Sequence, residues 1–166
     1  MTAQISEKLI YDGQEVGMYT NPLGDYFAFG GERPNFAYNC TALWRGYVGT
    51  WEIVDDRLYL IALHGTLEDG SEAMLTTVFR DYPDRVFAHW YTGTIRIPQG
   101  KLLNYVHMGY GSTYEGDIFL ELEKGVVRCT RIQQNGVSER KGAPEGYKIG
   151  GMTVFPIATK DVEKHP

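Results

Sequence analysis

The chain has 166 residues and a formal net charge of −5, and 43% of its residues are hydrophobic, 13% aromatic and 22% charged. These values are ordinary for one globular domain, and the acidic balance argues against a nucleic-acid groove, which needs clustered Lys and Arg. No apolar run is long enough for a transmembrane helix, and the first residues lack the pattern of a signal peptide. Cys40 and Cys129 are therefore predicted to be reduced thiols in a cytoplasmic protein that binds neither nucleic acid nor membrane.

The first predicted element is a β-hairpin over residues 8–18. Its turn is Asp12-Gly13, which is among the strongest two-residue hairpin signals because both positions tolerate positive φ. This turn places Leu9 opposite Val16, so that both side chains lie on one face of the hairpin.

Residues 42–64 form the second predicted hairpin, which turns at Asp55-Asp56. The register places Trp51 opposite Leu60 and Tyr47 opposite His64 on a face that is almost wholly apolar, and this face is predicted to enter the core. Arg45 falls on the same side. A guanidinium there needs a carboxylate partner or a position beyond the edge of the sheet.

Two segments depart from the strand pattern. Residues 21–39 are rich in Gly, Pro and Asn and are predicted to form a long loop with one helical turn at 25–29. Between Ser71 and Arg80, apolar residues recur at helical spacing, and Ser71 can cap the first turn. The sequence therefore predicts one short helix near residues 71–80, packed across the sheet.

The third predicted hairpin, residues 85–110, gathers most of the histidine and tyrosine side chains that could carry chemistry. The reversal is placed at Pro98-Gln99-Gly100, because Pro suits the first turn position and Gly supplies a positive φ. The resulting register places Gly93 opposite Tyr105 and groups four side chains on one face of the sheet as a candidate ligand-binding pocket. These are His89, Tyr91, Tyr105 and His107.

A fourth hairpin is predicted over residues 117–132. Its turn is Lys124-Gly125, and its register places Glu121 opposite Arg128 as a favourable cross-strand charge pair.

The whole pattern predicts a mainly β protein with a single domain over residues 1–160. We expect an antiparallel β-barrel or a strongly curved sheet with one short helix. Residues 152–158 are predicted to add a closing edge strand, and residues 161–166 are predicted to form a disordered tail.

No metal site, cofactor site or catalytic nucleophile is predicted. The histidines and cysteines lack CxxC, HxH and HExxH spacing, and the chain has no G-x-S-x-G elbow. Residues 109–113, GYGST, resemble a phosphate-binding nest but lack the Lys of a P-loop, so we interpret them as a tight connection between strands.

Three classes of function stay open. The leading one is a non-catalytic binding protein that blocks a protein partner or binds a small molecule at the candidate pocket. The second is a hydrolase or lyase that uses His89 and His107 as base and acid, with Tyr91 or Tyr105 stabilising the developing charge. The third is a structural module whose edge strands pair between copies. The sequence leaves the oligomeric state open.

Two long segments resemble sequences of a group of small, uncharacterised bacterial proteins. They are TALWRGYVGTWEIVDDRLYLIALHGTLEDG (residues 41–70) and VFAHWYTGTIRIPQGKLLNYVHMGYGSTYE (residues 86–115), so that the resemblance covers the central part of the chain, about residues 40–125. The resemblance implies a bacterial origin and a β-rich core, and it carries over no activity and no catalytic residue.

Overall fold

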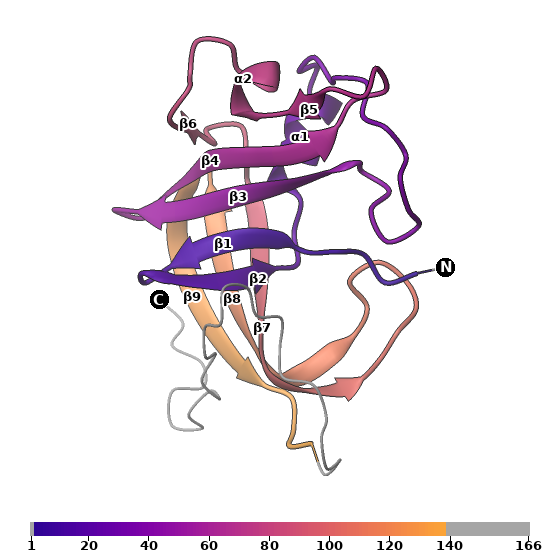
Figure 1. Ribbon diagram of the computed structural model, residues 1–166. Coiled ribbons are helices and arrows are strands. Elements are labelled where there is room, and N and C mark those ends of the chain that lie inside the picture. Colours follow the sequence, from indigo (N-terminus) through magenta and orange to yellow (C-terminus); the bar gives the residue numbers. More distant parts are fainter. Residues whose placement is uncertain (1, 139–166) are drawn as a thin grey trace.

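The computed structural model describes residues 2–138, and within this range nine strands form one sheet (Figure 1). The strands, in chain order, are β1 (Glu7–Tyr11), β2 (Gln14–Met18), β3 (Tyr47–Val54), β4 (Arg57–Thr66), β5 (Glu72–Ala73), β6 (Val86–Phe87), β7 (Gly93–Asn104), β8 (Thr113–Glu123) and β9 (Val126–Gln134). Two short helices belong to the same range, α1 (Pro22–Ala28) and α2 (Leu75–Val78). The prediction of a mainly β protein is confirmed.

The sheet has the order β2-β1-β3-β4-β9-β8-β7, with β5 and β6 both paired to β4. It is mixed, because β1 and β3 run parallel, and it is not closed into the predicted antiparallel barrel. The long connection from β2 to β3, which includes α1, makes the parallel pairing possible. Figure 1 shows β7, β8 and β9 running steeply behind β1 to β4.

The core lies between these two parts of the sheet. Trp51 and Leu60 enter it from β3 and β4, and Ile95 and Leu120 enter it from β7 and β8. All four side chains are fully buried. Alternation along each strand therefore sends one set of side chains into a core that both parts share.

The first two hairpins follow the predicted turns. Leu9 pairs with Val16, and Trp51 pairs with Leu60, as predicted. Beyond Trp51 a β-bulge shifts the second register by one residue, so that Tyr47 pairs with Gly65 instead of the predicted His64. A bulge adds one residue to one strand and leaves no clear mark in an alternating pattern.

The fourth hairpin turns at Lys124-Gly125, as predicted, and both residues have positive φ. A bulge next to Glu121 then places Cys129 opposite it, so the predicted pairing of Glu121 with Arg128 is wrong. Arg128 Nε instead lies 3.9 Å from Glu123 Oε2, and both side chains are exposed. An exposed pair of this kind contributes little to stability.

The third predicted hairpin is wrong. Strand β7 continues through Pro98 and Gly100, and the chain reverses in the loop at residues 105–112, which includes the GYGST segment. As β7 is at the edge of the sheet, Pro98 removes no ladder hydrogen bond, and the positive φ of Gly100 accompanies a bulge rather than a turn. Gly93 consequently pairs with Leu122 and not with Tyr105.

The predicted helix near residues 71–80 is shorter than expected. Glu72 and Ala73 form β5 on the edge of β4, and α2 spans only Leu75–Val78, with Met74 at its N-cap. Strand pairing has displaced the first turn of the predicted helix, and Ser71 bonds to Asp69 in the preceding turn. A second helix, α1, begins with Pro22 inside the segment predicted to be mostly loop.

The predicted closing strand at 152–158, the tail at 161–166 and the domain boundary at 160 lie outside the described residues. Within residues 2–138, no helix is long and apolar enough to cross a membrane.

Candidate functional site

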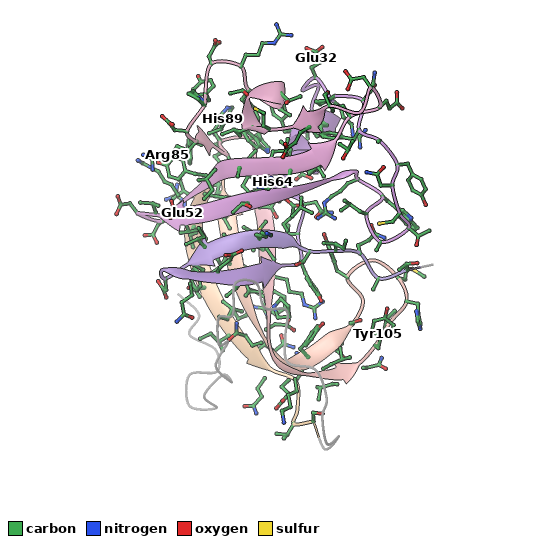
Figure 2. The ribbon with its side chains drawn as sticks, in the orientation of Figure 1. Glu32, Glu52, His64, Arg85, His89 and Tyr105 are labelled. Carbon is green, nitrogen blue, oxygen red and sulfur yellow. The ribbon has the colours of Figure 1, made fainter. Side chains whose placement is uncertain are left out.

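The structure does not gather the four predicted pocket residues. Tyr91 is buried, and its hydroxyl donates to the carbonyl of Thr94. Tyr105 and His107 lie in the β7–β8 loop with their ring centroids 4.5 Å apart. His89 is exposed in the chain before β7, and Figure 2 places it at the opposite end of the molecule from Tyr105. Only Tyr105 and His107 therefore share a site.

Tyr105 and His107 belong to a surface made of three neighbouring segments, which we call the three-segment surface. Its central segment is tied to both others, because the Gln4 amide donates to the Gly109 carbonyl and the Ile5 amide donates to the Ala42 carbonyl. These segments lie together at the N-terminal side of the molecule in Figure 1. The three segments are residues 2–5, 40–44 and 105–110.

The three-segment surface exposes large apolar side chains. The exposed fractions are 36% for Ile5, 49% for Trp44, 48% for Tyr105 and 56% for Met108. None of the three segments contains Asp, Glu, Lys or Arg, although these residues make up 22% of the chain. Enrichment in aromatic residues and Met with depletion of charge is typical of the centre of a protein interface.

An ion pair between a partly buried Arg96 and a buried Asp117 holds the β7–β8 loop in place. Arg96 Nε donates to Asp117 Oδ1 at 2.7 Å, and the two other guanidinium nitrogens donate to the carbonyls of Tyr110 and Ser112, each at 2.9 Å. The Ser112 hydroxyl accepts from the amide of Val106 at 3.0 Å. Charge-assisted hydrogen bonds of this kind fix the loop geometry from within the molecule.

A second ion pair supports the two other segments. Glu7, which follows the first segment, is 0% exposed, and its Oε1 accepts from Arg45 Nε at 2.8 Å. Its Oε2 accepts from the Gly49 amide and from Trp51 Nε1, both at 2.9 Å. Burial raises the pKa of Glu7, whereas Arg45 and the two N–H donors lower it in part. Glu7 is thus the carboxylate that the core-facing Arg45 requires.

Metal chemistry finds no support in the described chain. Across residues 2–138, no group of three or more His, Cys, Asp or Glu side chains is placed to hold a metal ion.

The fold and the surface together define the class of protein. It is a mainly β protein with an open mixed sheet and with an apolar surface, free of Asp, Glu, Lys and Arg, on the three segments outside the strands. Comparison with family models, curated proteins and solved structures found no match to the chain. The resemblance of residues 41–70 and 86–115 to small bacterial proteins stays a prediction.

Proposed function

We propose that this chain is a non-catalytic binding protein that docks a protein partner through the three-segment surface. The observation that supports this proposal best is that four large exposed apolar side chains share a surface without ionic side chains. Single exposed apolar residues need no explanation, whereas several on neighbouring, hydrogen-bonded segments favour an interaction surface.

The hydrogen bonds that anchor the surface support the same proposal. The Arg96–Asp117 and Glu7–Arg45 pairs fix the segments before any partner arrives. A surface that is already ordered avoids much of the entropy cost of ordering loops on binding. Such a surface favours docking with little backbone movement.

The net charge of −5 indicates the kind of partner. An acidic protein attracts a partner with a basic rim, and the uncharged centre requires apolar side chains opposite it. We therefore propose a partner that places an apolar patch within basic surroundings. Both cysteines are free thiols in the structure, which supports the cytoplasmic location that we propose with this function.

The hydrolase or lyase alternative has less support. A general base and a general acid must both reach one substrate. His107 packs on Tyr105, and Tyr105 lies far from His89 in Figure 2, so these two imidazoles do not face one small substrate.

The proposal is tested by comparing a surface variant with a matched control. The wild-type chain is immobilised and exposed to extract from its source organism, and each captured protein is purified for calorimetric titration. We expect Met108→Asp to weaken binding of the true partner by about tenfold or more, because the charge would be buried at the interface. Phe29→Asp serves as the control, since Phe29 is 75% exposed but lies outside the three segments.

Two surface variants, each checked for folding, distinguish a loss of binding at the surface from a loss of the folded structure. Met108→Asp and Trp44→Asp both change exposed side chains, and their folding is checked by circular dichroism. If every captured protein binds both variants as tightly as the wild type, the three-segment surface is not the docking site.

A further inference from the structure

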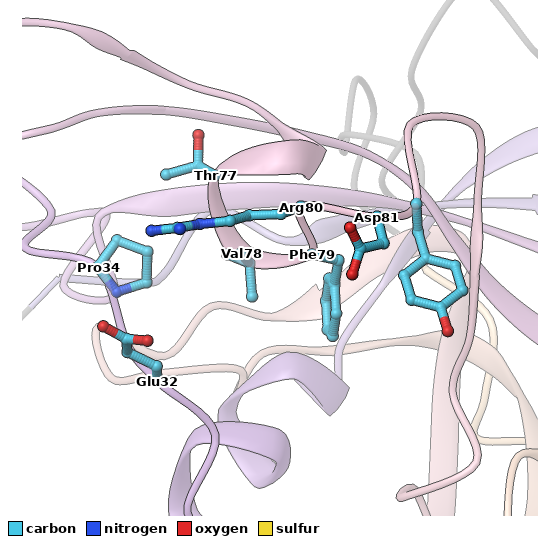
Figure 3. A pocket seen from close by; sticks show the side chains of 8 residues that line it. Glu32, Pro34, Thr77, Val78, Phe79, Arg80 and Asp81 are labelled. Carbon is cyan, nitrogen blue, oxygen red and sulfur yellow. The ribbon is translucent and has the colours of Figure 1, made fainter.

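A pocket of about 550 Å³ lies between the segment after α1 and the segment that contains α2 (Figure 3). Its volume is within the range of small-molecule sites. It shares no residue with the three-segment surface, so it is independent of the proposed docking function. The residues that line it are Glu32, Pro34, Thr77, Val78, Phe79, Arg80, Asp81 and Tyr82.

Phe79 gives the pocket a fixed aromatic wall. Its ring stacks on Trp90, with centroids 5.7 Å apart and an interplanar angle of 16°, and it packs against Tyr26 at 4.8 Å. The indole N–H of Trp90 donates to the carbonyl of Pro22 at 2.8 Å, which ties the rings to α1. Because each ring supports the next, the wall keeps its shape without a ligand.

Gly31 allows the opposite wall to approach. A Cβ at this position would overlap the ring of Tyr26, so only glycine lets the backbone pass so close to it. Glu32 and Pro34 follow directly, and Figure 3 shows both on one side of the pocket, with Phe79 and Asp81 on the other.

The pocket carries exposed ionic side chains of both signs that form no ion pair with one another. Among the described residues, no side-chain hydrogen bond or ion pair involves Glu32, Arg80 or Asp81. Figure 3 shows the Arg80 side chain reaching toward Pro34, whereas the Asp81 carboxylate lies beside Phe79. The Arg80 guanidinium and the Asp81 carboxylate thus lie at opposite sides of the pocket, with Phe79 and Pro34 as its apolar surfaces.

We propose that this pocket binds a small zwitterionic ligand of the amino-acid or dipeptide class. The ligand carboxylate pairs with the Arg80 guanidinium, which matches a carboxylate in two-point geometry. The ligand ammonium pairs with Asp81, and an apolar ligand side chain packs on Phe79 and Pro34. Glu32 adds a second carboxylate, so the lining carries more negative than positive charge and disfavours a simple anion.

Alanyl-phenylalanine is the probe for this proposal. The unlabelled dipeptide is titrated into the ¹⁵N-labelled full chain, and the amide shifts of residues 77–82 are followed together with the heat of binding. We expect saturable binding at the pocket. The N-acetylated dipeptide lacks the ammonium and the C-terminal amide lacks the carboxylate, and each should bind about tenfold more weakly than the free dipeptide.

Variants assign each end of the ligand to a residue. In Arg80→Gln, the free and amidated dipeptides should bind equally, and in Asp81→Asn, the free and acetylated dipeptides should bind equally. The matched controls are Arg128→Gln and Asp84→Asn, which change exposed charges outside the pocket and should preserve both differences.

Three results would overturn the proposal. They are the absence of saturable shifts at residues 77–82 at millimolar dipeptide, equal binding of the free and capped dipeptides to the wild type, and capping differences that survive in Arg80→Gln and Asp81→Asn. Because the changed side chains are exposed, loss of folding does not explain any of these results.

Discussion

At the scale of single residues, Tyr47 shows how a polar side chain is accommodated in the core. The residue is 2% exposed, and its ring packs against Phe36, with centroids 5.0 Å apart, and against Phe27 at 6.1 Å. The Arg45 guanidinium lies 5.6 Å from the ring centroid. Burial raises the pKa of the Tyr47 hydroxyl above its usual value near 10, and the nearby Glu7 raises it further.

This shift predicts a loss of stability at alkaline pH. Above about pH 10 the unfolded chain loses the Tyr47 proton while the folded chain keeps it, so the free energy of unfolding falls as pH rises toward the folded pKa. Tyr47→Phe keeps the packing and removes this contribution, and its stability should therefore fall less steeply with pH than that of the wild type. Urea unfolding from about pH 8 to pH 11 measures both slopes.

A second buried tyrosine also contributes to the loss of stability at alkaline pH. Tyr91 is also buried with a raised pKa, so Tyr47→Phe should reduce the alkaline slope without abolishing it. Tyr91→Phe removes the other contribution and should reduce the slope in the same direction. Equal slopes for Tyr47→Phe and the wild type would show that burial of Tyr47 does not control the alkaline loss.

Some residue-scale features were readable from the sequence and others were not. The Asp12-Gly13 and Lys124-Gly125 turns were predictable, because few residue pairs adopt positive φ at both positions. The turn predicted at Pro98 and Gly100 was wrong, because the same two residue types also suit a bulged edge strand. Only the pairing of β7 with β8 distinguishes a hairpin turn from a bulged strand at these positions. The sequence predicted that Arg45 needs a partner, but Glu7 lies 38 positions earlier and no local pattern points to it.

At the scale of secondary-structure elements, the Glu7–Arg45 pair joins the start of β1 to the chain that enters β3. Because Glu7 is fully buried and Arg45 nearly so, removing one charge leaves the other without compensation in the core. Glu7→Gln should lower the free energy of unfolding by about 3 to 5 kcal/mol. Chemical denaturation at neutral pH measures this loss, with Glu121→Gln, an exposed change, expected to stay within about 0.5 kcal/mol.

The same variant tests the support of the three-segment surface. Since Glu7 holds Arg45 beside the second segment, Glu7→Gln should also increase hydrogen exchange at the amides of Ile5 and Trp44. A loss below about 1 kcal/mol, with unchanged exchange at these amides, would mean that the ion pair supports neither the fold nor the surface.

Bulges explain why the predicted elements were right in kind but wrong in register. In both the β3–β4 and β8–β9 hairpins the pairing is correct next to the turn and shifts by one residue further away. A turn fixes only the nearest pairs, and a bulge depends on how the strands twist around the core. The sequence therefore predicted Trp51 opposite Leu60 but not the pairing of Tyr47.

At the scale of the whole molecule, few backbone contacts join the two parts of the sheet. Strands β4 and β9 share one register pair, Arg57 with Val126, flanked by the bonds from the Leu58 amide to the Gly125 carbonyl and from the Val127 amide to the Asp56 carbonyl. On the other side, the amide of Tyr19, the residue after β2, donates to the Arg96 carbonyl on β7 at 2.8 Å. The shared core, rather than a hydrogen-bonded ladder, must therefore hold the two parts together.

This arrangement predicts that both parts unfold in one cooperative step. Leu60 on β4 and Leu120 on β8 are fully buried in the same cluster, so Leu60→Ala and Leu120→Ala should each lower the free energy of unfolding by about 2 to 5 kcal/mol. Because the cluster is continuous, Leu120→Ala should reduce hydrogen-exchange protection in β3 as much as in β8. Two independent units would instead confine the loss in Leu120→Ala to β7, β8 and β9, and native-state hydrogen exchange of both variants distinguishes these outcomes.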